Sequence, residues 1–405
     1  MKKQITFLFV LVLLSCSAKK NKEKQSDKKT EMHTSSVVKI IEAANITNDY
    51  LPLLKGKKVG VVANQTSVIF KAHNKPIHLV DSLMSLKINI VKAFAPEHGF
   101  RGVADAGEHV SDGVDKATGL PVISLYGKNR KPAKAQLQNI DVMLFDIQDV
   151  GVRFYTYIST LHYVMEACAE QNIPVVVLDR PNPNGHYVDG PILEKEFKSF
   201  VGMHSVPIVY GMTIGEYAKM INGEGWLKNK IKCNLTVVPL KNYTHASTYN
   251  LPIKPSPNLP NATSINLYPS LCFFEGTNVS CGRGTEMQFQ IFGSPYLSKK
   301  YFPFQFIPQP NFGAKNPKNK GEINYGRDLR AAQKLGYINL NWLIEAYNHT
   351  TDKKVFFNAF FSKLAGTETL QKQIIQGMSV KEIKAGWQND LEKFKNTRSK
   401  YLLYP

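Results

Sequence analysis

The chain has 405 residues, of which 43% are hydrophobic and 20% charged, and its formal net charge is +19. This composition permits a packed core and, at ordinary domain sizes, two domains, which excludes a wholly disordered chain. No arginine-rich block or known nucleic-acid motif accompanies the positive charge, so we do not expect nucleic acid as a partner. Anionic lipids and carboxylated cell-wall glycans are the partners that a basic exported protein would meet.

The amino-terminal residues read as an export signal. Two lysines precede an apolar stretch over residues 5–14, and a small residue and a cysteine follow it. This pattern predicts a lipoprotein signal peptide over residues 1–16, with lipid attached at Cys16. The stretch is shorter than the roughly 20 apolar residues of a membrane span, so we expect a lipid-anchored envelope protein facing the periplasm or the cell surface. An ordinary buried helix is the alternative.

Residues 17–36 are polar and rich in lysine, so we expect a solvated tether. From residue 37 onward, strand-like runs alternate with helical runs, which predicts an α/β, Rossmann-like domain with a mainly parallel sheet over residues 37–245. A helical stripe begins at Ile158, and a capping box joins Thr213 to Glu216. The predicted strands are Val59–Ala63, Ile88–Phe94, Val122–Leu125, Val142–Phe145, Val175–Leu178 and Leu235–Val238.

The remaining residues, 246–405, are expected to form a smaller α+β domain. A stretch with four prolines over residues 251–260 resists helix and central strand, and indicates a crossing between the domains. Helical patterns follow over residues 335–347 and 379–401, and the second opens on a capping box of Ser379 and Glu382.

The sequence lacks the motifs of several kinds of site. There is no CxxC or HExxH motif, so a zinc site has little support. There is no GxGxxG after the first strand and no P-loop spacing, so we expect no nucleotide cofactor in spite of the Rossmann-like pattern. Cys272 and Cys281 are close enough in the chain for a disulfide, but buried thiols are the expected state.

Polar side chains follow three of the predicted strands and open the second domain. Ligands of open α/β sheets bind outside the carboxyl ends of the strands, so these four segments are expected to converge on one cleft. The candidate residues, in chain order, are Glu97, His98 and Arg101; Asp146, Gln148, Asp149, Arg153, Tyr155 and Tyr157; Arg180 and Asn182; and Glu275, Asn278, Arg283 and Glu286.

Glu97 is the first candidate for a general acid, because a loop after a strand can hold a carboxyl partly desolvated and raise its pKa. A helix cap or an ion pair with Arg101 is the alternative. Asp146 and Asp149 could equally cap a helix or pair with Arg153.

Each of the candidate arginines and tyrosines could also have either a functional or a structural role. Arg153, Arg180 and Arg283 could each hold a carboxylate of a substrate, or could form structural ion pairs. Tyr155 and Tyr157 could stack on sugar rings, or could pack in the core.

Six long strings in this chain resemble the exo-acting β-N-acetylmuramidases of the NamZ-like family, glycoside hydrolase family 171, formerly a domain of unknown function. The resemblance runs nearly end to end, and ordered strings of this length are far more specific than a short pattern. The strings are GVVANQTS from Gly60, APEHGFRG from Ala95, FDIQDVGVRFYTY from Phe145, DRPNPNG from Asp179, FEGTNVSCGRGTE from Phe274 and YLLYP from Tyr401.

The resemblance implies a cleft between the two domains that releases terminal N-acetylmuramic acid (MurNAc) from peptidoglycan fragments such as MurNAc-GlcNAc, in cell-wall recycling. Glu97 would be the acid and Glu275 the second carboxylate, with Asp149 in reserve. The lactyl carboxylate would be held by Arg283 or Arg153, and the acetamido group by Asn182 or Asn278. The competing hypotheses are a non-catalytic lipoprotein that binds wall sugars and an NAD-type enzyme, and the missing glycine motif weighs against the latter.

Overall fold

The computed structural model describes residues 39–70, 75–102 and 112–405. The signal sequence, Cys16 and the tether lie outside the described residues. Residues Lys39–Pro405 form one compact unit. Within the described ranges, every helix is too short or too polar to cross a bilayer.

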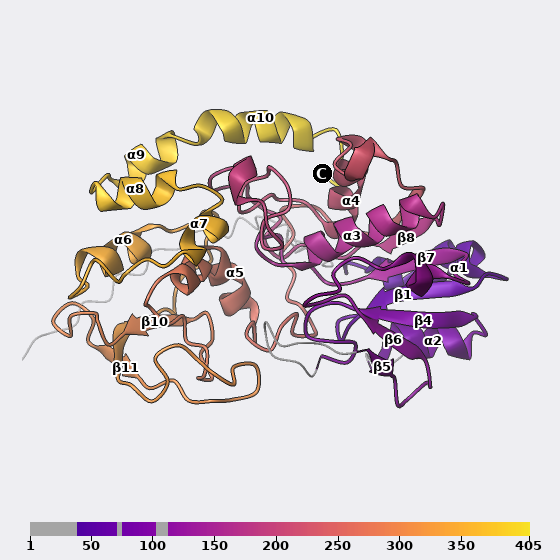
Figure 1. Ribbon diagram of the computed structural model, residues 1–405, viewed down its shortest axis with the longest axis horizontal. Coiled ribbons are helices and arrows are strands. Elements are labelled where there is room, and N and C mark those ends of the chain that lie inside the picture. The colour runs from indigo at the N-terminus through magenta and orange to yellow at the C-terminus, as the bar shows by residue number, and fades with distance from the viewer. Residues whose placement is uncertain (1–38, 71–74, 103–111) are drawn as a thin grey trace, which may run out of the picture. The chain divides into compact units, whose positions relative to one another are not determined.

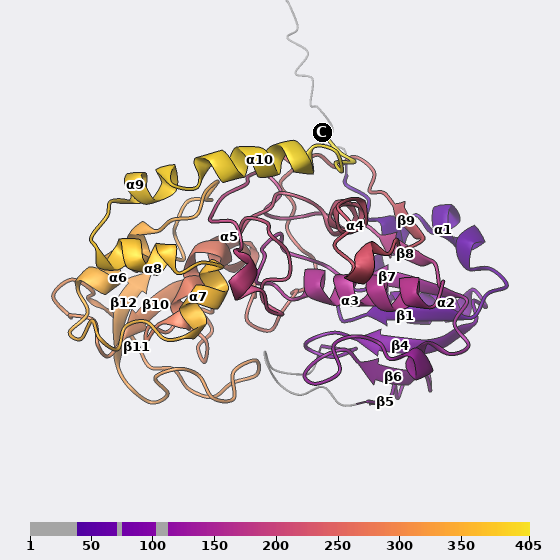
Figure 2. The ribbon, with the colours of Figure 1, turned by 45° about the horizontal axis from the view of Figure 1, so that its top comes forward.

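The first lobe is built on a sheet of seven strands in the order β5-β6-β4-β1-β7-β8-β9, shown at the right of Figures 1 and 2. All neighbours pair in parallel except β5 with β6. β1 lies at the centre, where Val61 pairs with Ala93 on one side and Leu144 on the other. The strands are β1 Val59–Ala63, β4 Ile90–Ala95, β5 Gly113–Val114, β6 Pro121–Ser124, β7 Val142–Asp146, β8 Val175–Leu178 and β9 Leu235–Val238.

Helices cover both faces of this sheet, because its central strands are apolar on both sides. On one face Val62 and Phe145 join the core formed with α3 and α4, and on the other Val61 and Leu144 join the core formed with α1 and α2. A small hairpin precedes α2. These elements are α1 Thr47–Leu54, α2 Leu79–Ser85, α3 Tyr157–Glu170, α4 Ile214–Gly223, β2 Val68–Phe70 and β3 Pro76–His78.

The second lobe combines an antiparallel sheet of order β10-β12-β11 with a group of short helices. The core of α3 and α4 continues without a break into this lobe, through residues such as Phe274, Phe292 and Leu343. Its elements are α5 Ala262–Leu271, the 3-10 helix η6 Cys272–Gly276, β10 Ile291–Ser294, β11 Phe304–Phe306, β12 Asn324–Asp328, α6 Asn341–Asn348, α7 Phe360–Ala365, α8 Thr369–Ile375, α9 Val380–Ala385 and α10 Gln388–Arg398.

The last five residues return to the first lobe after α10 (Figure 2). The Tyr404 hydroxyl donates to Asp179 Oδ2 at 2.6 Å and accepts from the Leu240 amide at 2.8 Å. The carbonyl of Pro405 accepts from the His245 amide at 2.8 Å. The YLLYP string therefore attaches the carboxyl terminus to the DRPNPNG segment.

The α/β fold with a Rossmann-like sheet and a smaller α+β part is confirmed, and each predicted strand occurs within two residues of its expected bounds. Both capping boxes form. Two helical predictions were too long. Residues 335–339 do not form a helix, because the amides of Leu335 and Ile338 donate hydrogen bonds to Asn266 and Asp189. The last helical pattern divides into α9 and α10 at Gly386 and Trp387.

Candidate active site

A cavity of about 610 Å³ lies between the two lobes, within the size range of small-ligand sites. Its walls come from the turn after β4, the loop after β6, the start of α3, the proline-rich crossing, η6 and the loop before β12. The lining includes Glu97, His98, Tyr126, Phe154, Tyr155, Thr156, Ser256, Asn258, Tyr268, Glu275, Arg283, Phe289, Lys315, Lys318 and Phe360. Two of the three predicted catalytic carboxylates, Glu97 and Glu275, thus share one cavity.

Glu97 reaches the cavity from a sharp turn at the carboxyl end of β4. His98 and Gly99 both adopt positive φ, 69° and 78°, and the turn they form redirects the chain directly after the strand. Such a conformation is uncommon for a residue with a side chain. The Thr156 hydroxyl donates to Glu97 Oε2 at 2.7 Å, and the Tyr126 side chain also hydrogen-bonds Glu97. Burial and then this carboxylate raise the pKa of Tyr126, so it stays a donor.

Glu275 reaches the cavity from the opposite lobe, on η6. Arg283 Nε donates to Glu275 Oε1 at 2.6 Å, and the same guanidinium lies 5.1 Å from the centre of the Phe289 ring. The sulfurs of Cys272 and Cys281 lie 3.8 and 4.0 Å from the two carboxylate oxygens. Burial raises the pKa of both thiols, to about 12 for Cys281, so they remain protonated. The two cysteines are free thiols, as expected.

Four buried aromatic residues, Phe154, Tyr155, Tyr268 and Phe289, line the cavity. Phe154 and Tyr268 meet edge to face at 5.3 Å, as do Tyr268 and Phe289 at 4.9 Å. Tyr155 donates its hydroxyl hydrogen to the carbonyl of Pro255 at 2.8 Å, which attaches the proline-rich crossing to the first lobe. Tyr157 lies outside the lining, where its hydroxyl accepts from Asn64 at 2.9 Å.

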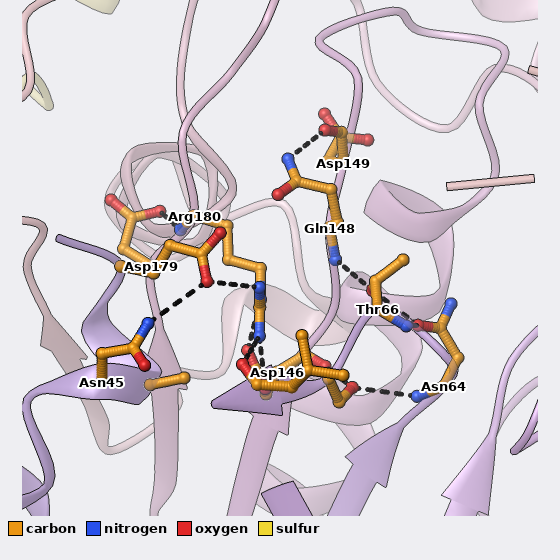
Figure 3. A network of polar contacts seen from close by, with 12 residues as sticks. Asn45, Asn64, Thr66, Asp146, Gln148, Asp149, Asp179 and Arg180 are labelled. Carbon is orange, nitrogen blue, oxygen red and sulfur yellow. Dashed lines mark hydrogen bonds and ion pairs between the residues drawn. The ribbon is translucent and has the colours of Figure 1, made fainter. Parts of the chain in front are cut away.

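The acidic and amide side chains at the end of β7 do not line the cavity. Asp146 is completely buried and holds Arg180 through two bonds of 2.6 and 2.8 Å, as Figure 3 shows. Arg180 also pairs with Glu42 at 3.1 Å. The expectation that Asp146 and Arg180 face the cleft is therefore wrong. The two residues form a buried structural ion pair between the end of β7 and the segment preceding α1.

Gln148 and Asp149, which Figure 3 also draws, are buried and do not line the cavity. Gln148 donates to the carbonyls of Asp149 and Pro181, at 2.7 Å each. Asp149 accepts from the Gly151 amide at 2.7 Å and from the Tyr210 hydroxyl. Burial raises the pKa of Asp149 to about 6, against the effect of these hydrogen bonds. The geometry thus favours Glu275 over Asp149 as the second carboxylate.

Two more of the predicted arginines stabilise the fold, as Arg180 does. Arg153 is completely buried and donates to the carbonyls of Pro191, Val206, Leu364 and Ala365, which join the two lobes. Arg101 pairs with Asp81 and Asp115 at 3.0 and 2.8 Å, and not with Glu97 as the alternative reading held. Only Arg283 among the predicted arginines lines the described cavity.

The predicted amide ligands and Glu286 also lie outside the lining. Asn182 is buried, and its side chain bonds to the Asn184 amide and the Met212 carbonyl at 2.8 Å each. Asn278 is partly buried, with its backbone amide bonded to Phe356. Glu286 is exposed. None of the three contributes to the cavity wall within the described residues.

Sequence reasoning missed several lining residues. Tyr126 directly follows the end of β6, a position that the rule of strand carboxyl ends could have found. Ser256, Asn258 and Lys318 belong to the two proline-rich stretches, which the sequence indicated only as connections. Long irregular segments between domains often carry binding residues, and their polar side chains were the available signal.

The side chains that line the cavity suit the cleavage of a glycosidic bond. It offers two carboxylates from opposite walls, hydroxyl and guanidinium donors beside them, and apolar ring surface. In the described ranges, no three His, Cys, Asp or Glu residues gather so that they could hold a metal ion.

Comparison with known proteins covers nearly the whole chain. A family model for the N-terminal part of the exo-β-N-acetylmuramidase NamZ matches residues 59–263, and its C-terminal counterpart matches residues 266–404. The chain is 37% identical to the peptidoglycan β-N-acetylmuramidase NamZ of Bacillus subtilis, over 97% of this chain and 96% of that protein.

Two solved structures of DUF1343 family proteins from Bacteroides fragilis have the same fold. They superpose with TM-scores of 0.82 and 0.75 at 46% and 30% identity, and each comparison covers 90% of this chain and 99% of the other.

Proposed function

Because the chain belongs to the NamZ family of exo-β-N-acetylmuramidases, which are glycoside hydrolases, we propose that it releases MurNAc from the non-reducing end of fragments such as MurNAc-GlcNAc in cell-wall recycling. The observation that carries this proposal is the meeting of Glu97 and Glu275, from different lobes, in one cavity. A pair of carboxyl groups on either side of the scissile bond is what most glycosidases use.

Glu97 is the proposed general acid. It would protonate the glycosidic oxygen as the bond to the leaving sugar breaks. Thr156 and Tyr126 fix its carboxyl group, so that the proton is presented in one direction. Holding a reacting group in place in this way lowers the entropic part of the barrier.

Glu275 is the proposed second carboxylate. Its ion pair with Arg283 and its two thiol neighbours suit a group that works as an anion, either stabilising the oxocarbenium-like transition state, activating water or attacking the sugar. Arg283 is also our candidate for the lactyl carboxylate of MurNAc, since a guanidinium can bond to more than one carboxylate at once.

The action is proposed to take place in the cell envelope. The signal pattern before Cys16 supports export and lipid attachment, and wall fragments are found where such an anchor would hold the enzyme. Incorporation of labelled fatty acid by the wild type, and its loss in a Cys16→Ser variant, would test the anchor.

The test of the function is product analysis by NMR on two disaccharides. We expect the wild type to release MurNAc from MurNAc-GlcNAc and to leave GlcNAc-MurNAc intact, because only the first carries MurNAc at its non-reducing end. In Glu97→Gln the release should fall about 100- to 10,000-fold, the usual contribution of a general acid. Glu322→Gln, which changes an exposed glutamate outside the lining, is the matched control.

Undiminished release by Glu97→Gln would remove Glu97 from the mechanism. Binding of the disaccharide by the wild type without any release of MurNAc would instead favour a non-catalytic protein that binds wall sugars.

A further inference from the structure

The aromatic side chains of the cavity wall differ sharply in exposure. Phe289, Phe154, Tyr155 and Tyr268 are only 1%, 3%, 6% and 7% exposed, whereas Phe360 is 36% exposed. Lys315 and Asn316, which also line the cavity, are exposed as well. The four buried rings therefore mark the inner end of the cavity, and Phe360 lies at its mouth.

The exposure of the two carboxylates points to a position between these ends. Glu97 and Glu275 are both of intermediate exposure, unlike the buried rings and unlike Phe360. If the scissile bond lies at the carboxylates, the terminal sugar occupies the inner end and the leaving sugar faces the mouth. This direction is the one that an exo-acting enzyme requires, because the rest of the glycan must extend into solvent.

Phe360 is held firmly although its ring is exposed. Its amide donates to Asn358 Oδ1 at 2.9 Å at the start of α7. The next residue, Phe361, is completely buried and packs on Phe357 at 4.6 Å. A Cβ placed on Gly276 would come within 2.4 Å of the Phe361 Cα, so α7 lies directly against the end of η6 that carries Glu275.

An exposed phenylalanine on a rigid backbone at the mouth of a sugar site has a clear use. Its ring offers a flat apolar surface for the C–H face of a pyranose, without the entropy cost of ordering a mobile loop. Resting on the function proposed above, we propose that Phe360 is a specificity-determining residue, whose ring stacks on the leaving sugar, the N-acetylglucosamine unit of MurNAc-GlcNAc.

The test compares two substrates that differ only in the leaving group. MurNAc-GlcNAc places a sugar at the mouth, whereas β-N-acetylmuramyl fluoride places a single atom there. In Phe360→Ala we expect KM for the disaccharide to rise about three- to tenfold, the range that loss of one aromatic contact gives. We expect kcat for the disaccharide, and both constants for the fluoride, to stay within about twofold.

Two further variants separate stacking from a general loss of structure. Phe360→Tyr keeps the ring and should restore the wild-type KM for the disaccharide. Tyr337→Ala removes a ring that is 48% exposed but lies outside the cavity lining, and should change neither substrate.

Equal losses on both substrates in Phe360→Ala, or no loss on either, would overturn the assignment. Failure of the proposed function would look different, because the wild type would then hydrolyse neither substrate.

Discussion

At the scale of the residue, burial decides which of the acidic side chains can meet a substrate. Asp149 and Glu97 both follow a central strand, but Asp149 is only 3% exposed and bonds to Tyr210 and Gly151. Glu97 instead lines the cavity between the lobes. The sequence placed both at the end of the sheet and preferred Glu97, but it could not show that Asp149 is covered, since the covering comes from residues some sixty positions later in the chain.

Asp149 makes stability depend on pH. Burial raises its pKa in the folded state to about 6, above the value of about 3.9 expected in the unfolded chain. Between these values the folded state binds more protons than the unfolded state, so the contribution of Asp149 to stability falls as the pH rises from about 4 through 6.

We therefore expect Asp149→Asn to gain stability relative to the wild type as the pH rises. The free energy of unfolding of the variant minus that of the wild type should increase by about 2 kcal/mol between pH 4 and pH 7. Urea unfolding at several pH values would measure this difference. A difference that stays constant over the range would contradict the assigned pKa.

At the scale of the element, η6 carries the second carboxylate and is held in part by the half-buried amine of Lys318. Lys318 Nζ donates to the carbonyl of Phe274 at 2.8 Å and to that of Thr277. Asn358 lies beside the same carbonyl of Thr277, at 3.5 Å. The position of Glu275 thus depends on Lys318, which comes from the proline-rich stretch before β12.

Lys318→Met should make η6 more mobile, although the Glu275 side chain itself is unchanged. We expect kcat/KM for MurNAc-GlcNAc to fall about tenfold or more, because small displacements of a catalytic group are costly. Stability should fall by about 1–3 kcal/mol, because the carbonyls of Phe274 and Thr277 lose a charged donor. Lys320→Met, at an exposed position two residues further on, is the control. Equal activity of the two variants would show that Lys318 does not position Glu275.

The regular elements were predictable where one local pattern determines them. The apolar runs from Val59 and from Val175 became β1 and β8 at their predicted bounds, because a strand buried on both faces reads as a continuous apolar run. The strands of the second lobe were not located. Four of the five positions in β12 are polar, charged or glycine, and its pairing with β10 and β11 is set by contacts distant in sequence.

At the scale of the whole molecule, the site exists only because both lobes contribute to it. The sequence favoured Glu97 as the acid and, with the resemblance to the NamZ-like family, Glu275 as the second carboxylate, but it also assigned substrate contacts to the buried cluster after β7. The polar residues of that cluster stabilise the fold. Asp146 and Arg180 form an ion pair inside the first lobe. Arg153 joins the lobes through hydrogen bonds to four carbonyls.

The contacts that join the lobes could not be derived from the sequence, because they connect positions far apart in the chain. Arg153 reaches Ala365, Tyr155 reaches Pro255 and Tyr404 reaches Asp179. Each of these bonds fixes a wall of the cavity or the chain that supports it. A polar residue in a string of the family can thus serve to link the lobes.

The central claim, that Glu97 and Glu275 perform different tasks on one glycosidic bond, is tested most directly by the leaving-group dependence of two variants. A fluoride leaves without protonation, whereas a sugar needs an acid. We therefore expect Glu97→Gln to lose most of its kcat on MurNAc-GlcNAc and little on β-N-acetylmuramyl fluoride, and Glu275→Gln to lose kcat on both. Full activity of Glu275→Gln on either substrate, or equal losses on both substrates in Glu97→Gln, would contradict the account.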